Sequence, residues 1–184
     1  MLRKGRRNAL IRVLRKPKGT IGILLLLTLI IMAILAPYIA PHSPLKQNLR
    51  MRNSPPGTRS VTAEGKFFLL GTDQLGRDLF SRILHGMRVS LLVAAVAVTI
   101  SGVIGTFLGI LSGYVGGVLD VLIMRLVDIQ LSLPLILIAM IWIAFTKPSL
   151  VNIIVVIAFW TWTQYARVTR ASTLSVREAG FIEA

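Results

Sequence analysis

Long uncharged stretches separate the charged positions of this chain, and these stretches predict its helices. The first runs from residue 19 to residue 45 and has a continuous apolar core at residues 21–36. About 20 apolar residues suffice to cross a hydrocarbon core of roughly 30 Å. We therefore predict a first membrane helix over residues 19–40. A cleaved signal peptide shares the basic start and the apolar run, but the core here is longer than such peptides carry.

Three further spans are predicted within residues 89–166. The second covers residues 89–111 and ends before the glycine-rich stretch 113–117, where flexible backbone favours a helix stop. The third covers residues 121–145. The fourth covers residues 148–166, begins at a proline and ends with three aromatic residues typical of a membrane interface, Trp160, Trp162 and Tyr165. The pattern predicts an all-α membrane protein, a bundle of four transmembrane helices.

The segment between the first two spans, residues 41–88, ends in a stretch with helical periodicity. Its apolar face consists of Leu79, Phe80, Ile83, Leu84 and Met87, while Asp78, Arg82, His85 and Arg88 lie largely on the other face. We predict an interfacial helix that leads into the second span, with a membrane-surface anchor as the favoured role and docking of an external partner as the alternative. The sequence Ser-Pro-Pro-Gly at residues 54–57 predicts a loop. If this segment is helical, the i,i+4 spacing predicts ion pairs Asp73–Arg77 and Asp78–Arg82, which would partly neutralise its charge.

Composition supports the membrane interpretation, and charge sets an orientation. Of 184 residues, 54% are hydrophobic, and 21 Lys and Arg against 7 Asp and Glu leave a net charge of +14. The densest basic stretch, residues 1–18, is predicted to be a cytoplasmic tail by the positive-inside rule. Four crossings then return residues 167–184 to the cytoplasm and place residues 41–88 outside, although that segment is also basic. Without interleaved aromatic residues, the basic tail favours anionic lipid over nucleic acid.

Enzymatic signals are nearly absent from the sequence. It has no cysteine, only two histidines (His42 and His85), and no phosphate-binding, zinc-hydrolase or serine-hydrolase motif. We predict no catalytic residue, no metal site and no cofactor in this chain. Any ATP that drives its work would have to be bound by partner subunits.

Small residues recur every four positions along the second span. They are Ala97, Ser101, Gly105, Gly109 and Gly113. This spacing stacks small side chains into one groove that another helix can approach closely. We predict a helix-packing face, and a groove that also lets helices slide during gating is the functional alternative.

Two charges lie within the predicted third span. Arg125 and Asp128 are three residues apart and share a helix face. Charge inside a membrane is costly unless it is paired, solvated or close to the interface. We favour a local ion pair between them near the cytoplasmic end. The alternative makes Asp128 a lining residue of a polar path, which would need a partner from another segment.

Several motifs occur in a fixed order along nearly the whole chain. They are LGTDQLGRDLFSR at residues 70–82, RVSL at 88–91, GYVGG at 113–117, MRLVD at 124–128, LP at 133–134 and RVTR at 167–170. This series closely resembles the permease subunits of the peptide and nickel ABC importers. The tail that follows resembles the approach to the cytoplasmic EAA loop, through which such permeases engage their ATPases.

The resemblance implies an importer built from two permeases and two ATPase subunits, fed by an extracytoplasmic solute-binding protein, in the inner membrane of a bacterium or archaeon. The partners of this chain would be a second permease, the ATPases, the binding protein and the lipid bilayer, with no nucleic acid. ATPase coupling is implied for Arg177, Glu178, Glu183 and Ala184, although Gly180 stands where the family usually has an acidic residue. Because the family continues into a further helix and two spans, we interpret the chain as a permease truncated at the start of the loop.

We therefore expect a transmembrane permease subunit of an ATP-driven, binding-protein-dependent importer that forms the translocation path with a second permease. Peptides are the family's commonest cargo, and nickel or another small solute is the other choice. Two alternatives remain. One is a small four-span membrane adaptor or assembly protein, which would need only the packing face and the basic tail. The other is a non-functional permease remnant.

Overall fold

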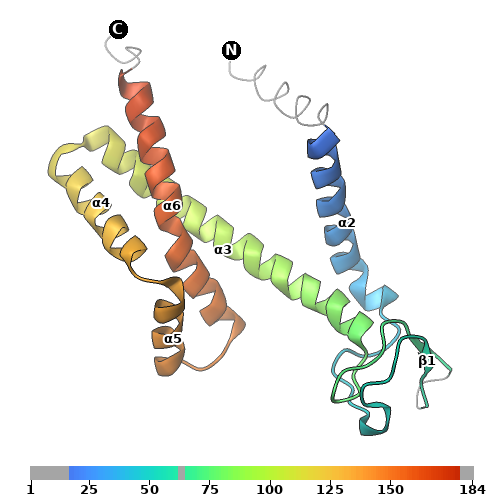
Figure 1. Cartoon of the computed structure of the whole chain (residues 1–184). Coiled ribbons are helices and arrows are strands. Elements are labelled where there is room, and N and C mark those ends of the chain that lie inside the picture. The colour runs from blue at the N-terminus through green and yellow to red at the C-terminus, as the bar shows by residue number, and fades with distance from the viewer. Residues whose placement is uncertain (1–16, 62–64, 179–184) are drawn as a thin grey trace. The chain divides into compact units, whose positions relative to one another are not determined.

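Helices dominate the computed structural model, which describes residues 17–61 and 65–178 (Figure 1). In chain order the elements are α2 (Pro17–Ile39), η1 (Leu49–Met51), β1 (Thr58–Arg59), β2 (Phe67–Phe68), α3 (Leu79–Val115), α4 (Gly117–Ser132), α5 (Leu135–Phe145) and α6 (Leu150–Glu178). The chain divides into two compact units, Met1–Leu91 and Leu92–Ala184. Each unit is described by itself, and α3 runs from the first into the second.

The candidate membrane spans are fewer than the sequence pattern predicts. Within residues 17–61 and 65–178, two helices, α2 and α3, are long and apolar enough to cross a bilayer, and α4 with α5 makes a third if the pair counts as one broken span. These helices support the predicted all-α membrane class. The predicted fourth span falls in α6, which is not among these candidates, so the number four stays a prediction.

The residues of the predicted interfacial helix are helical and continuous with the predicted second span. Residues 79–88 form the first turns of α3, which continues without a break for 37 residues through the predicted second span. The change from an amphipathic to a wholly apolar pattern alters the surroundings of a helix but supplies no backbone signal to end it. At 1.5 Å per residue, α3 is about 55 Å long, well beyond a hydrocarbon core of about 30 Å.

The predicted third span is broken rather than straight. α4 and α5 are bent by 87° at the residues between them. Leu133 is extended there, with φ −92° and ψ 134°, and Pro134 follows with ψ 132°. A proline supplies no backbone N–H and holds the residue before it out of helical conformation, which explains the break. Both α4 and α5 pack against α6 (Figure 1).

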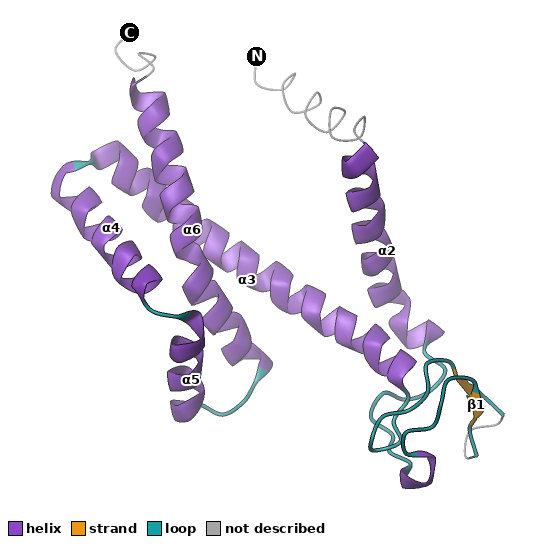
Figure 2. Cartoon of the chain, viewed as in Figure 1, coloured by secondary structure: helices purple, strands orange, loops and turns teal. Residues whose placement is uncertain are grey.

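Loops, two short strands and the short 3-10 helix η1 form the connecting segment, the name used here for residues 40–78 between α2 and α3 (Figure 2). The strands β1 and β2 are antiparallel, with Thr58 opposite Phe68. The predicted loop at residues 54–57 is present. Two glycines of the loops have left-handed backbone and lie close to other main-chain atoms: Gly71 at φ +79° and Gly76 at φ +69°. Their hydrogen atoms face the main chain of residues 48–56, where a Cβ atom would clash.

Asp78 closes the connecting segment onto the start of α3. Its Oδ2 accepts hydrogen bonds from the Ser81 amide at 3.1 Å and from the Ser81 hydroxyl, so Asp78 acts as the N-cap of the helix. The His42 amide donates to Ser81 Oγ at 3.2 Å, and the His42 ring stacks on Phe68. The predicted Asp78–Arg82 ion pair is therefore wrong, because the Asp78 carboxylate is buried at the cap while Arg82 reaches Asp73.

Asp73 is the charged centre of the connecting segment. The predicted Asp73–Arg77 pair is confirmed, with Arg77 Nε donating to Asp73 Oδ2 at 2.8 Å, and Arg82 pairs with the same oxygen. Burial of Asp73 opposes its ionisation, but hydrogen bonds from the Arg77 amide, the Arg77 guanidinium and the Leu75 amide outweigh it. Together they lower the pKa of Asp73 from 3.8 to about 2.

The lowered pKa of Asp73 predicts that the connecting segment is destabilised by acid. A carboxyl whose pKa is lower in the folded state stabilises that state above its unfolded value, so this contribution disappears as pH falls from about 4 towards 2. A fluorophore on Arg52→Cys, unique because the chain has no cysteine, reports urea unfolding across this range. Asp73→Asn should reduce the dependence of the free energy of unfolding on pH in this range. Asp128→Asn, in the other unit, should leave that dependence unchanged. An unchanged slope in Asp73→Asn contradicts the assignment.

Candidate functional site

The small residues predicted to form a packing face on α3, Ala97, Ser101, Gly105, Gly109 and Gly113, are called the glycine stripe here, and its three glycines lie against α6. A Cβ atom on Gly105 would stand 2.3 Å from the Trp162 carbonyl oxygen, and one on Gly109 would stand 2.5 Å from the Ala166 carbonyl oxygen. At Gly113 the nearest atom is Thr173 Cβ at 2.8 Å. Ala97 and Ser101, the other two members of the stripe, are fully buried. The small residues thus admit α6 at a distance that a methyl group would prevent.

Asp120 joins three helices beside this contact. The chain reverses between α3 and α4 through Gly116 and Gly117, which have φ +70° and +59°. This turn brings the first turn of α4 back towards the end of α3, where the Ser112 hydroxyl donates to Asp120 Oδ1 at 2.5 Å. Arg170 of α6 donates from Nε to Oδ1 at 2.5 Å and from NH2 to Oδ2 at 2.6 Å. We call Ser112, Asp120 and Arg170 the Asp120 clamp.

The predicted local ion pair between Arg125 and Asp128 is wrong. Asp128 Oδ1 instead accepts from Arg167 NH2 of α6 at 2.8 Å, and no Arg125–Asp128 pair forms among the residues described. An i,i+3 spacing permits a pair without requiring one, and α6 brings a second guanidinium to the same carboxylate. Because both side chains of the Asp128–Arg167 pair are more than half exposed, this pair contributes little free energy outside a membrane.

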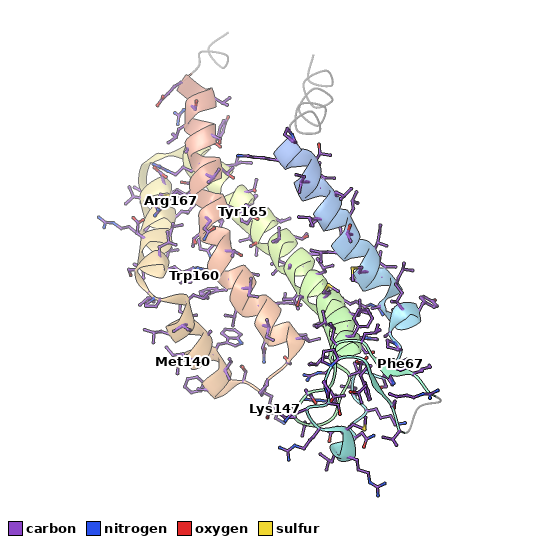
Figure 3. All side chains as sticks on the ribbon, turned by 45° about the vertical axis from the view of Figure 1, so that its right-hand side comes forward. Phe67, Met140, Lys147, Trp160, Tyr165 and Arg167 are labelled. Atoms are coloured by element: carbon purple, nitrogen blue, oxygen red, sulfur yellow. The ribbon has the colours of Figure 1, made fainter. Side chains whose placement is uncertain are left out.

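Gln130 ties α4 to the middle of α6. Its amide nitrogen donates to the Phe159 carbonyl at 2.6 Å, and its amide oxygen accepts from Trp162 Nε1 at 3.0 Å. Figure 3 shows Trp160, Tyr165 and Arg167 following one another along α6. α6 continues to Glu178, so the aromatic group predicted to close the fourth span lies within a longer helix, and Trp162 holds a polar partner inside the protein.

The implied coupling residues lie at and beyond the end of α6. Arg177 NH1 donates to the Tyr114 carbonyl at the end of α3, at 3.2 Å, and Glu178 is the last described residue. Glu183 and Ala184 fall outside the described residues. Arg167, Arg170 and Arg177 therefore connect α6 to three points on α3 and α4, and all three lie within residues 167–184, the predicted coupling segment.

Sequence reasoning missed Ser112, Asp120 and Gln130. The available signals were a single carboxylate three residues after the Gly116–Gly117 pair and a single glutamine in a charge-free run. Both residue types need partners when they are buried. The α6 partners of Gln130 and Asp120 lie 29 and 50 residues away in sequence, a separation that local periodicity does not bridge. The partner of Ser112 is Asp120 itself, across the turn between α3 and α4.

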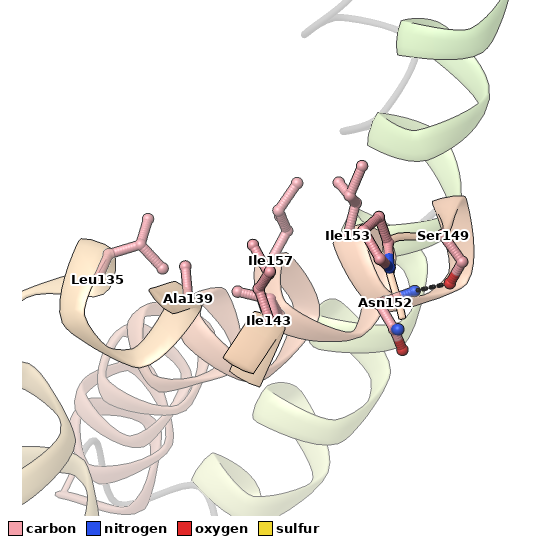
Figure 4. A pocket seen from close by; sticks show the side chains of 9 residues that line it. Leu135, Ala139, Ile143, Ser149, Asn152, Ile153 and Ile157 are labelled. Atoms are coloured by element: carbon pink, nitrogen blue, oxygen red, sulfur yellow. Dashed lines mark hydrogen bonds between the residues drawn. The ribbon is translucent and has the colours of Figure 1, made fainter. Parts of the chain in front are cut away.

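An apolar pocket of about 300 Å³ lies between α5 and the first turns of α6 (Figure 4). Aliphatic side chains such as Leu135, Ile143 and Ile153 line most of it, and its polar edge consists of Ser149 and Asn152. The Asn152 amide donates to Ser149 Oγ at 3.2 Å, and its side chain donates to the Lys147 carbonyl. Among the described residues that line it, none is charged, so the pocket suits an apolar group and not the termini of a peptide.

Two family models match the chain. The model described as the inner membrane component of binding-protein-dependent transport systems matches residues 105–184, which include the three glycines of the stripe and the Asp120 clamp. The model of the N-terminal transmembrane domain of oligopeptide transport permease C matches residues 6–56.

Individual relatives extend this match over most of the chain. The dipeptide transport system permease protein DppC of Haemophilus influenzae is 39% identical over 162 residues, 88% of this chain and 54% of the relative. The chain belongs to the permease family of binding-protein-dependent transport systems. The di/tripeptide transport system permease protein DppC of Pseudomonas aeruginosa is 40% identical over 91% of this chain and 55% of the relative. The dipeptide transport system permease protein DppC of Bacillus subtilis is 35% identical over 93% of this chain and 51% of the relative.

The chain spans about half the length of the curated relatives that it matches. Membership of this permease family, together with its apolar helices, makes it a multi-pass membrane protein. The comparisons do not favour an unrelated four-span adaptor, because that interpretation predicts no such series of relatives.

Proposed function

We propose that this chain is a permease subunit of an ATP-driven importer for small peptides. The observation that carries the proposal is its 39% and 40% identity, over about nine-tenths of the chain, to permeases named for dipeptide and di/tripeptide transport. It would form the translocation path with a second permease and receive cargo from an extracytoplasmic solute-binding protein. The chain itself would have no catalytic activity, and separate ATPase subunits would bind and hydrolyse ATP.

The proposed orientation places the amino terminus in the cytoplasm of a bacterium or archaeon. Support comes from the basic residues before the first span and from Arg167, Arg170 and Arg177 on α6. The connecting segment would then face outward. Because the chain has no cysteine, Arg52→Cys should react with a membrane-impermeant thiol reagent on intact cells and Val176→Cys should react only after lysis. The reverse pattern contradicts the orientation.

Uptake of radiolabelled dipeptide tests the proposed function. The gene is deleted in its own organism and restored from a plasmid, and uptake of labelled dipeptide and of ⁶³Ni²⁺ is measured at the same time. We expect deletion to abolish the saturable dipeptide uptake and restoration to return it. Loss of nickel uptake alone would refute the peptide assignment, and unchanged uptake of both would refute the transport assignment.

A further inference from the structure

The bidentate geometry of the Asp120 clamp restricts more than the distance between helices. Arg170 presents two parallel N–H groups to the two oxygens of Asp120, at 2.5 and 2.6 Å, and the Ser112 hydroxyl fixes the carboxylate from the side of α3. A two-point contact of this kind sets orientation as well as separation. The carboxylate is also shielded, since the Asp120 side chain is 18% exposed against 61% for Asp128.

The position of the clamp opposes sliding along the glycine stripe. Arg170 directly follows the α6 residues that face Gly109, and its own carbonyl oxygen would lie 3.1 Å from a Cβ atom on Gly113. A smooth groove by itself permits α6 to shift along α3, but a shift of one helical turn, about 5.4 Å, would separate Arg170 from Asp120. The stripe therefore provides close approach, and the clamp selects a single register for it.

Arg170 of the clamp also precedes the implied coupling residues Arg177 and Glu178 along one continuous helix. α6 runs unbroken from Arg170 to Glu178, and two turns beyond Arg170 the Arg177 guanidinium donates to the Tyr114 carbonyl. A displacement applied at the end of α6 is therefore transmitted through helix backbone to Asp120. From there it reaches α4 directly and α3 through Ser112.

We propose that Asp120 is a positioning residue that makes α6, α4 and the end of α3 move as one body when the coupling segment is displaced. This inference rests on the proposed function, because it assigns the part of the chain that converts ATPase movement into movement of the transport path. The bidentate pair between the Asp120 carboxylate and the Arg170 guanidinium resists both sliding and rotation of α6. The exposed Asp128–Arg167 pair, a one-point contact on the same two helices, is the matched control.

The functional test measures dipeptide uptake per ATP hydrolysed in proteoliposomes containing the importer assembled with this permease. A merely structural defect lowers the amount of complex and therefore lowers both rates together, leaving their ratio unchanged. We expect Asp120→Asn to lower the ratio at least tenfold. Arg170→Lys keeps the positive charge but loses the bidentate contact, so we expect it to lower the ratio about threefold. In Asp128→Asn the ratio should stay within twofold of wild type. A ratio unchanged in both clamp variants would overturn the proposal.

A distance measurement on the chain itself separates failure of the inference from failure of the proposed function. Spin labels on Val121→Cys in α4 and Val168→Cys in α6, both exposed, report the α4–α6 distance distribution in lipid nanodiscs. We expect Asp120→Asn and Arg170→Lys to at least double its width and Asp128→Asn to leave it unchanged. Unchanged widths in the clamp variants would overturn the inference whether or not the importer carries peptides. If the wild-type importer shows no peptide uptake, the proposed function is overturned instead.

Discussion

Gly105→Ala should unfold the α3–α6 contact, although alanine is the better helix former. The new Cβ atom would lie 2.3 Å from the Trp162 carbonyl oxygen and 2.6 Å from Tyr165 Cβ. Backbone cannot give way as a flexible side chain does, so α6 must move outward and lose its contacts along the stripe. We expect a loss of about 3 kcal/mol in the free energy of unfolding, at the upper end of what overpacking costs.

Gly102→Ala is the matched control for this prediction. Gly102 lies three residues earlier in the same helix, and within the described part of the chain nothing lies within 4 Å of the position that its methyl group would take. The same substitution should stabilise α3 by about 0.5–1 kcal/mol, because alanine loses less backbone entropy than glycine in a helix. Tryptophan fluorescence during SDS titration in mixed micelles measures both, since all three tryptophans lie in α5 and α6. Equal effects at the two positions would contradict close packing at Gly105.

Hydrophobic patterning predicted the helical membrane class because apolar length is a local property of the chain. The first predicted helix, residues 19–40, differs from α2 by one or two residues at each end. Patterning failed where backbone geometry decides. In the predicted third span apolar residues stand on both sides of Pro134, so the length of the apolar stretch does not mark the 87° bend. At Arg88 the polarity of the chain changes but the element does not, because α3 continues through this residue.

The candidate site shows the same division between local and distant information. The glycine stripe was predictable because its members repeat every four residues on one helix, but its partner helix was not. Asp120 and Gln130 each carry a polar group whose partner comes from α6, and only the folded chain brings them together. The Arg125–Asp128 prediction was wrong for this reason, since the sequence offered a nearby cation and the fold supplied Arg167.

Gly76→Ala should open the connecting segment. Gly76 has φ +69°, and a Cβ atom there would lie 1.8 Å from the Asn48 carbonyl oxygen. The stretch of chain at Asn48 would have to move, breaking the hydrogen bond from the Asn48 amide to the Leu75 carbonyl at 3.1 Å. Left-handed backbone with a Cβ atom costs about 1–2 kcal/mol by itself, and the backbone clash adds at least as much, so we expect a total of about 4 kcal/mol.

Gly57→Ala separates the two contributions to this loss. Gly57 has φ +80°, yet in the described residues no atom lies within 4 Å of the added methyl group, so this variant carries only the conformational cost of about 1–2 kcal/mol. Hydrogen–deuterium exchange of the amides at residues 48–53 and 71–76 measures the opening free energy in each variant. We expect Gly76→Ala to remove protection from both stretches and Gly57→Ala to preserve most of it. Comparable protection in the two variants would show that backbone conformation, and not the contact with Asn48, requires glycine at residue 76.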